Sequence, residues 1–257
     1  MENLKYLNKH ILKKEALILG FLFLFFTVSA QQERFNVRFD SDFPNTLLMS
    51  VIELEDGYVS TGFLGDSLNP LATPMIFAKF DLEGNFLFQE TYGGLGDAEY
   101  YSQNPDLNFL NDSVLIHSGI TYDSEGIRQG YIAYFNMDGD TLQVRRYYSP
   151  NPDPEYPFIA ALSVKKGTNN YLFFLANFVQ ESTGNDFLIW KIHENGDIIW
   201  QYTYETNQSP DYCRVIIPTD DGGVIAIAKI GVSGEEPNYH HIFKLDVDGE
   251  LDWEYES

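Results

Sequence analysis

The amino-acid sequence predicts an all-β fold, a β-propeller-like array of about four blades with four antiparallel strands each. A glycine turn recurs at Gly84, Gly139, Gly196 and Gly249, with spacings of 55, 57 and 53 residues. Short runs rich in β-branched and aromatic residues lie between the turns, and this is the composition and length of β-strands. Beyond residue 30 no stretch keeps the apolar spacing of a helix, so the rest of the chain should be almost free of helix.

The repeat extends well beyond the glycine. The nine-residue segments around it are 77–85, 132–140, 189–197 and 242–250. Aromatic residues follow in a constant phase: Phe88, Trp200 and Trp253 four residues after their glycines, and Tyr92, Tyr147 and Tyr204 eight residues after theirs. A second turn signal accompanies each unit, at 55–57, 111–113, 168–170 and 220–223. Landmarks in constant phase indicate a repeated structural unit, and we expect these aromatic residues to pack between blades.

Each unit should fold as a four-stranded antiparallel meander. In the last unit the expected strands are 214–218, 223–230, 240–246 and 251–255. Asp-Gly, Asn-Gly and Glu-Gly pairs favour tight hairpins, because glycine supplies a positive φ without steric cost. Tandem units of about 50 residues are typical of propeller blades, whereas the alternative, a stacked β-solenoid, has much shorter turns. We expect one repeat domain over 31–257, with units at about 40–92, 93–147, 148–204 and 205–257.

Ahead of the first unit, residues 35–39 repeat the aromatic spacing of an outermost strand. In a closed ring such a strand would complete the last blade. The last unit already has its own fourth strand at 251–255, so residues 35–39 have no waiting partner. The sequence therefore predicts an incomplete ring, as in a shortened version of a longer propeller. An open ring would leave strand edges and an apolar blade face exposed.

Residues 1–30 are expected to form a secretory signal peptide. Four lysines precede an apolar run from Ala16 to Phe26, and small residues lead to a cleavage point after Ala30. The alternative, a membrane anchor, needs about 20 apolar residues, which this run does not reach. We expect a secreted or cell-surface protein with no membrane span after cleavage. Cys213 is the only cysteine, so no intramolecular disulfide is expected, and it should be buried in a strand.

The charge of the chain excludes one large class of partners. The 257 residues include 38 Asp and Glu against 16 Lys and Arg, for a formal net charge of −22. A surface this acidic repels phosphate backbones, so nucleic acid is not an expected partner. A protein or a carbohydrate remains open.

The first unit carries a motif that resembles a known family. Residues 79–85, Phe88 and 92–97 read Lys-Phe-Asp-x-x-Gly-Asn, an aromatic residue, and Tyr-Gly-Gly-x-x-Asp. This pattern resembles the tandem repeats of secreted bacterial propeller-like proteins, and the resemblance extends over 56–255. Later units depart from it, with 148–150 and 204–206 in place of the Tyr-Gly-Gly step. Many members of that family carry a C-terminal sorting domain, which is absent here. The resemblance implies an extracellular location and no particular reaction.

The acidic turns at 136–140 and 246–250 resemble fragments of a calcium loop, because hard cations bind several oxygens around one tight turn. A full loop needs a third acidic position and a distant Glu, which they lack, and Asp and Asn are also ordinary hairpin residues. Hairpin turns are therefore expected, with weak Ca²⁺ binding left open. His240 and His241 should point to opposite faces of a strand, which argues against a shared metal. No catalytic, cofactor-binding or metal residue is assigned.

The sequence favours a non-enzymatic scaffold or binding module that contacts its partner through loops on one face. Tyr100, Tyr101, Tyr156 and Tyr212 follow the expected outer strands and could stack on sugar rings or a protein, although packing is the favoured role. The alternative function is a polysaccharide hydrolase or lyase. It would use carboxylates such as Asp97, Glu155 and Asp211 at the central channel.

Overall fold

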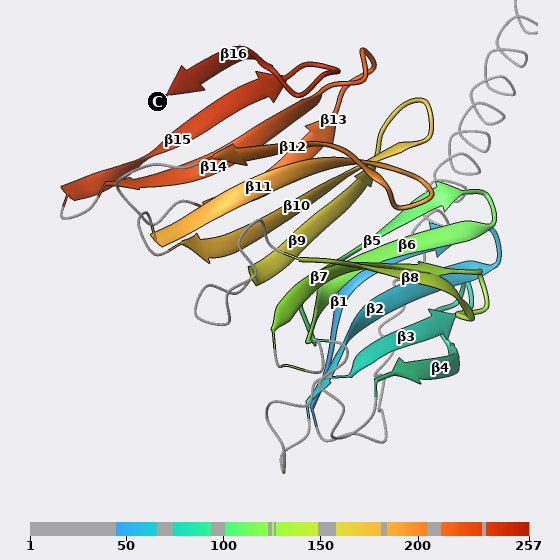
Figure 1. Cartoon of the computed structure of the whole chain (residues 1–257). Helices are drawn as coiled ribbons and strands as arrows, with labels where there is room; N and C mark the ends of the chain where they lie inside the picture. The colour runs from blue at the N-terminus through green and yellow to red at the C-terminus, as the bar shows by residue number, and fades with distance from the viewer. Residues whose placement is uncertain are drawn as a thin grey trace, which may run out of the picture. The chain divides into compact units, whose positions relative to one another are not determined.

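All regular secondary structure is β-strand over the residues that the computed structural model describes. These are residues 45–65, 74–93, 101–122, 125, 127–148, 158–180, 184–204, 212–232 and 235–256. All of them belong to the second of two compact units, which covers 39–257. The strands form four antiparallel sheets, each built from four consecutive strands (Figure 1). This confirms the predicted fold class.

We call the four sheets blades 1 to 4. Blade 1 consists of β1 (Asn45–Leu54), β2 (Gly57–Gly65), β3 (Met75–Phe80) and β4 (Phe86–Tyr92). Blade 2 consists of β5 (Tyr101–Asn111), β6 (Val114–Tyr122), β7 (Arg128–Phe135) and β8 (Thr141–Tyr147). Blade 3 consists of β9 (Phe158–Lys166), β10 (Tyr171–Gln180), β11 (Gly184–His193) and β12 (Ile198–Tyr204). Blade 4 consists of β13 (Tyr212–Pro218), β14 (Val224–Val232), β15 (Glu235–Leu245) and β16 (Leu251–Glu256).

The recurrent glycine closes the last hairpin of every blade. Gly84, Gly139, Gly196 and Gly249 have φ between 81° and 96°, the left-handed region that glycine tolerates best. In each turn the glycine N–H donates to the carbonyl of the residue three positions earlier. A side chain placed at Gly139 would also strike blade 1, because a Cβ there would lie 2.9 Å from Cδ1 of Phe77. The turn therefore requires glycine for its own geometry and for close packing.

Blade 3 shows how a strand buries both of its faces. The residues of β10 from Leu172 to Phe178 are all buried. Alternate residues point to opposite sides of a strand, so Phe174 packs with blade 2 while Phe173 packs with blade 4. The rings of Phe174 and Trp190 stack with their centroids 5.4 Å apart. Two-sided burial explains why these strands are continuous apolar runs instead of alternating ones.

The aromatic landmarks join consecutive blades through backbone carbonyls. The hydroxyl of Tyr92 donates to the carbonyl of Gly139, and the hydroxyl of Tyr147 donates to that of Gly196 at 3.2 Å. In the third interface Trp200 takes this role, and its Nε1 donates to the carbonyl of Val247 at 3.0 Å. Inter-blade packing of these residues is as predicted.

Phe88 stacks on Phe77 of its own blade, with ring centroids 6.4 Å apart, and packs against the apolar cluster that blades 1 and 2 share, as predicted. One landmark residue departs from the prediction. Trp253 lies on β16 and is 43% exposed, so the expected inter-blade contact is wrong for this residue. The physical reason is that no sheet covers the outer face of blade 4 in the described part of the chain. Consecutive blades pack on one another, yet the array does not close into a ring, as the sequence predicted. The expected extra strand at 35–39 lies outside the described residues.

Candidate binding surface

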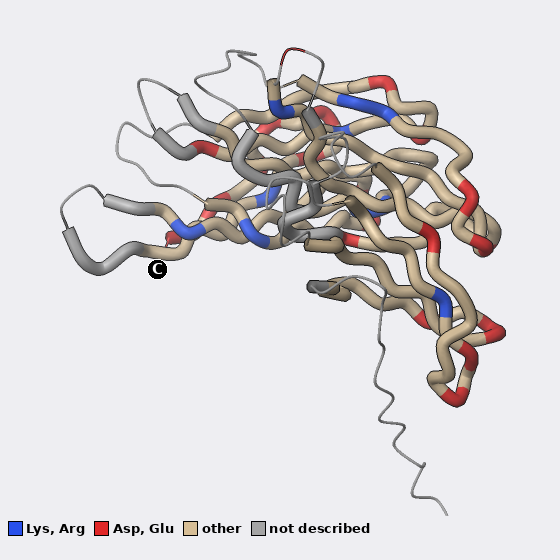
Figure 2. The backbone as a smooth tube through the Cα atoms, turned by 90° about the horizontal axis from the view of Figure 1, so that it is seen from below, with Lys and Arg blue, Asp and Glu red and all other residues tan. Residues whose placement is uncertain are grey.

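The hairpin turns β1–β2 and β3–β4 of blade 1, with their counterparts in the other blades, make up what we call the turn face. It consists of residues 55–56, 81–85, 112–113, 136–140, 167–170, 193–197, 219–223 and 246–250. An antiparallel meander brings its first and third turns to the same end of the sheet. Fourteen of these residues are Asp or Glu and none is Lys or Arg. Figure 2 shows acidic residues in red at the hairpin tips.

The side chain at the first position of each last hairpin holds the turn in shape. Asp246 Oδ1 accepts hydrogen bonds from the N–H groups of Asp248 and Glu250, both at 2.9 Å. Asn136 Oδ1 accepts from Asp138 and Asp140 in the same way, at 3.0 and 2.8 Å. These are the hydrogen bonds of ordinary Asx-type turns. They consume one oxygen that a cation would need.

The calcium prediction concerns these same turns. Within the described residues, no three His, Cys, Asp or Glu side chains are grouped so that they could hold a metal ion. The exposed carboxylates remain available to solvent, as at Asp138, whose side chain is 78% exposed. Weak calcium binding at the turns stays a prediction.

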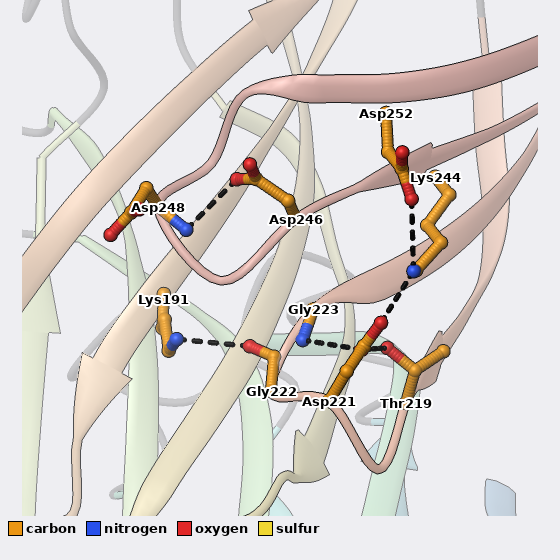
Figure 3. Close-up of polar contacts among 9 residues, drawn as sticks. All are labelled: Lys191, Thr219, Asp221, Gly222, Gly223, Lys244, Asp246, Asp248 and Asp252. Atoms are coloured by element: carbon orange, nitrogen blue, oxygen red, sulfur yellow. Dashed lines mark hydrogen bonds and ion pairs between the residues drawn. The ribbon is translucent and has the colours of Figure 1, made fainter.

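Under the turn face, one lysine position recurs five residues before the glycine. Lys79 in blade 1 is buried and its Nζ lies 2.9 Å from Asp56 of the same blade and 3.8 Å from Asp138 of blade 2. Lys191 in blade 3 is buried and donates to two carbonyls of blade 4, those of Gly222 at 2.9 Å and Val247 at 2.8 Å. Figure 3 shows the bond from Lys191 to Gly222. The buried lysines fasten the turns of one blade to those of the next.

Burial lowers the pKa of Lys191, because desolvation penalises the charged ammonium. The nearby carboxylates of Asp248 and Asp246 oppose this shift. The ring of Tyr171 lies under the ammonium, with its centroid 4.7 Å from Nζ. The acidic turns thus help to keep a buried lysine charged, which gives part of the acidity a structural role.

Lys244 occupies the same position in blade 4, where no further sheet of the described residues supplies carbonyls. Its Nζ instead bonds Asp221 and, at 3.0 Å, Asp252 of its own blade (Figure 3). Asp221 also accepts hydrogen bonds from the Thr219 hydroxyl and the Gly223 N–H. The hydrogen bond from Lys244 is the largest of the contacts that lower the pKa of Asp221, and the return effect raises the pKa of Lys244.

The histidines and the cysteine have structural settings. His241 is buried, with Nδ1 at 3.0 Å from the hydroxyl of Tyr204 and Nε2 at 3.1 Å from Glu254, while His240 is exposed. The adjacent pair does point to opposite faces. His117 is fully buried, its Nδ1 lies 3.2 Å from the hydroxyl of Thr61, and burial lowers its pKa to about 3. Burial raises the pKa of Cys213 to about 12, so its thiol is not activated as a nucleophile.

The residues proposed for the alternative enzymatic function are not placed. Asp97, Glu155 and Asp211 lie outside the described residues, as do Tyr100 and Tyr156. Tyr101 begins β5, with a side chain outside the described set, and Tyr212 is half-buried at the start of β13. Sequence reasoning did not assign a role to the recurrent lysine, although Lys79, Lys191 and Lys244 stand in one register of the repeat.

Neither a protein-family model nor a curated protein sequence matches the chain. Among solved structures, it is similar to Pyrococcus horikoshii acylaminoacyl peptidase, with 12% identity and a TM-score of 0.44 over 81% of this chain and 32% of that one. It is also similar to the β-propeller domain of the Trilobed protease from Pyrococcus furiosus, with 10% identity and a TM-score of 0.45 over 85% and 58%. The chain thus spans less than two thirds of either structure.

The sheets and their packing define the class of protein. Four antiparallel four-stranded sheets stacked in chain order make the described part of the chain a β-propeller-like protein with an open array of blades. Within the described residues no helix is long and apolar enough to span a bilayer.

Proposed function

We propose that the protein is a secreted or cell-surface, non-enzymatic binding module whose turn face takes a positively charged segment of a partner protein. The observation that carries this proposal is the charge of the turn face, which has fourteen acidic residues and no Lys or Arg among its described residues. Clustered charge of one sign raises the local concentration of an oppositely charged partner and speeds its association. A rigid surface also loses little conformational entropy on binding.

The turns are well suited to present this charge. Hydrogen bonds from backbone N–H groups to the first side chain fix these hairpins, as described for Asp246 and Asn136. Side chains such as Asp56 and Asp138 stay largely exposed while the lysines beneath them are buried. The negative charge therefore faces solvent, and its compensating positive charge is screened from a ligand.

The test measures binding of a lysine-rich probe peptide to immobilised residues 31–257, against a neutral peptide and a set of neutral glycans. Asp220 and Asp248 are exposed turn residues, so the D220N/D248N variant should weaken binding of the basic peptide by about threefold to tenfold. The matched control is E90Q/E125Q, which removes the same charge at exposed positions away from the turn face. Affinity should fall as salt rises. Equal losses in both variants, or preference for a glycan, would reject the proposed site.

The location and the lack of activity need separate tests. Export in a bacterial host followed by N-terminal sequencing should give a mature chain that begins at Gln31. Incubation with a panel of polysaccharides should release no reducing or unsaturated ends. Activity that disappears in D97N, E155Q or D211N would replace the binding function with the hydrolase or lyase function.

A further inference from the structure

The outer face of blade 4 repeats the surface with which blade 3 holds blade 4. The strand register places the residues of this face in two rows. One row is Val215, Ile227, Ile242 and Tyr255, and the other is Ile217, Ile225, Lys244 and Trp253. We call these eight residues the free face. Since directly opposed residues in a sheet point to the same side, the eight side chains share one face.

The equivalent positions of blade 3 form its interface with blade 4. Phe173, Leu175 and Ile189 correspond to Ile225, Ile227 and Ile242, and they are fully buried against blade 4. Lys191 corresponds to Lys244, and Trp200 corresponds to Trp253. Both bond to a carbonyl of blade 4, as described above. The free face therefore has the composition and layout of an established sheet-on-sheet interface.

Nothing in the described part of the chain covers this surface to the same extent. Val215 and Ile217 are 43% and 51% exposed, and Trp253 and Tyr255 are 43% and 62% exposed. A contiguous exposed apolar surface of this kind is typical of an interaction site.

We propose that the free face docks a second copy of this chain, so that two blade 4 sheets pack face to face in a symmetric dimer. A second copy supplies a blade whose apolar face matches in size. The face is also complementary to itself, because the bulky aromatic residues lie on β16 and the smaller β-branched residues lie on β13. A twofold axis parallel to the strands, between β14 and β15, lays β16 of one copy over β13 of the other.

This arrangement makes specific pairs. The axis places each row of one copy opposite the same row of the other copy. Tyr255 therefore faces Val215 of the partner copy, and Trp253 faces Ile217 of the partner copy. Lys244 meets the partner copy with its charge already compensated by Asp221 and Asp252. The pairing of large with small side chains fills space without a buried unpaired charge.

Size and charge set how tightly such a dimer holds. Four strands about 4.8 Å apart and six residues of about 3.3 Å give a patch of roughly 400 Å² per copy. The total of about 800 Å² is below the roughly 1,200 Å² at which stable interfaces begin and falls in the range of weak, transient ones. The two chains also repel, because each has a formal charge of −22. A reversible dimer is therefore expected, with a dissociation constant on the order of 10 µM that falls as salt screens the repulsion. This salt dependence is opposite to that of a basic ligand at the turn face, so failure of one proposal leaves the other intact.

The experiment is sedimentation velocity of residues 31–257 from about 1 to 100 µM protein in low and in high salt, a range that brackets the expected dissociation constant. The expected result is a monomer at the lowest concentration and a dimer at the highest, with at least tenfold weaker dimerisation in I217K/Y255K. The control L142K changes an exposed residue of β8, on blade 2, and should leave the dimer unchanged. Circular dichroism checks that all variants are folded.

A second measurement tests the geometry directly. A mixture of V215C and Y255C chains, treated with a short bis-maleimide linker, should give a crosslinked dimer that neither chain gives alone. A monomer under all conditions would overturn the proposal. A dimer that survives I217K/Y255K, or that L142K abolishes equally, would overturn it as well. Capture of a different protein without self-association would also count against it.

Discussion

Blades 3 and 4 share one strand pattern and one set of turns, but among the described residues a sheet packs on both faces of blade 3 and on one face of blade 4. The same sequence position therefore has two environments. Lys191 reaches forward to carbonyls of the next blade, whereas Lys244 folds back onto acids of its own blade. Phe173 is fully buried where Ile225 is half-buried. The difference teaches that the repeat unit is built for two neighbours, and that a terminal unit satisfies its polar groups locally while its apolar groups stay exposed.

The largest expected effect comes from truncating the same position in the two blades. F173A should lower the free energy of unfolding by about 3–5 kcal/mol, because it leaves a cavity in a covered interface. I225A should cost only about 1 kcal/mol in the monomer, since less apolar surface is lost from water contact there. Urea unfolding at low protein concentration measures both. Equal losses would mean that the outer face of blade 4 is covered in the monomer, contrary to the comparison.

The next effect concerns protonation of a group inside a covered interface. His117 has a folded pKa of about 3, below its ordinary value of 6.5, so the unfolded chain binds a proton that the folded chain does not. Stability from this group is therefore full above pH 6.5 and falls as the pH drops toward 3. The loss should be about 2.5 kcal/mol between pH 6.5 and pH 4.5.

The control for this pH effect is H117F, which places at this position the residue type that blade 3 has at Phe174. Unfolding free energies of H117F should vary less with pH over the same range, by about the amount attributed to His117. If the unfolding free energy of H117F depends on pH as that of the wild type does, other groups cause the loss of stability at low pH.

Replacing the recurrent lysine sharpens the comparison further. K191M should cost about 2 kcal/mol, because the carbonyls of Gly222 and Val247 lose a charged donor in a buried setting. K244M should give a smaller change in the unfolding midpoint, because its partners are exposed acids that water can solvate. Thermal unfolding of the two variants side by side provides the measurement. A larger loss of stability in K244M than in K191M would contradict the conclusion that Lys191 contributes more to stability.

The smallest effect is calcium binding at the acidic turns. With a dissociation constant of about 10⁻³ to 10⁻⁴ M, Ca²⁺ at about 1 mM should stabilise the chain by about 0.4–1.4 kcal/mol. Calorimetric titration of the wild type against D138N and D248N would locate the ion. No heat of binding and no change in melting temperature would remove the calcium prediction.

The local features of this fold could be predicted from sequence, and the non-local ones could not. Turns at Gly139 and Gly249 depend on a φ that their own residue adopts, so short motifs reveal them. The alternation of Phe173 and Phe174 between two neighbouring blades was accessible through the repeat, because each face must be covered. The open array could also be foreseen by counting strands.

The partners of Lys191 could not be foreseen in the same way. They are backbone carbonyls of another blade. Every residue has a backbone carbonyl, so the residue types at those positions do not reveal the contact. The same holds for Trp253, whose exposure depends on whether a further sheet is present and not on its own segment. The acidic surface was visible in composition, but its gathering on one face required the meander topology of all four sheets.

The bonds from Tyr92, Tyr147 and Trp200 to main-chain oxygens bear on how such arrays arise. Every peptide unit has a carbonyl oxygen that can accept such a hydrogen bond. The aromatic residue of a duplicated blade can therefore bond to the neighbouring blade without any change of side chain in that neighbour. Copies can then diverge in their side chains while they remain attached. Gene duplication can lengthen or shorten the array one unit at a time, and each intermediate length keeps its junctions.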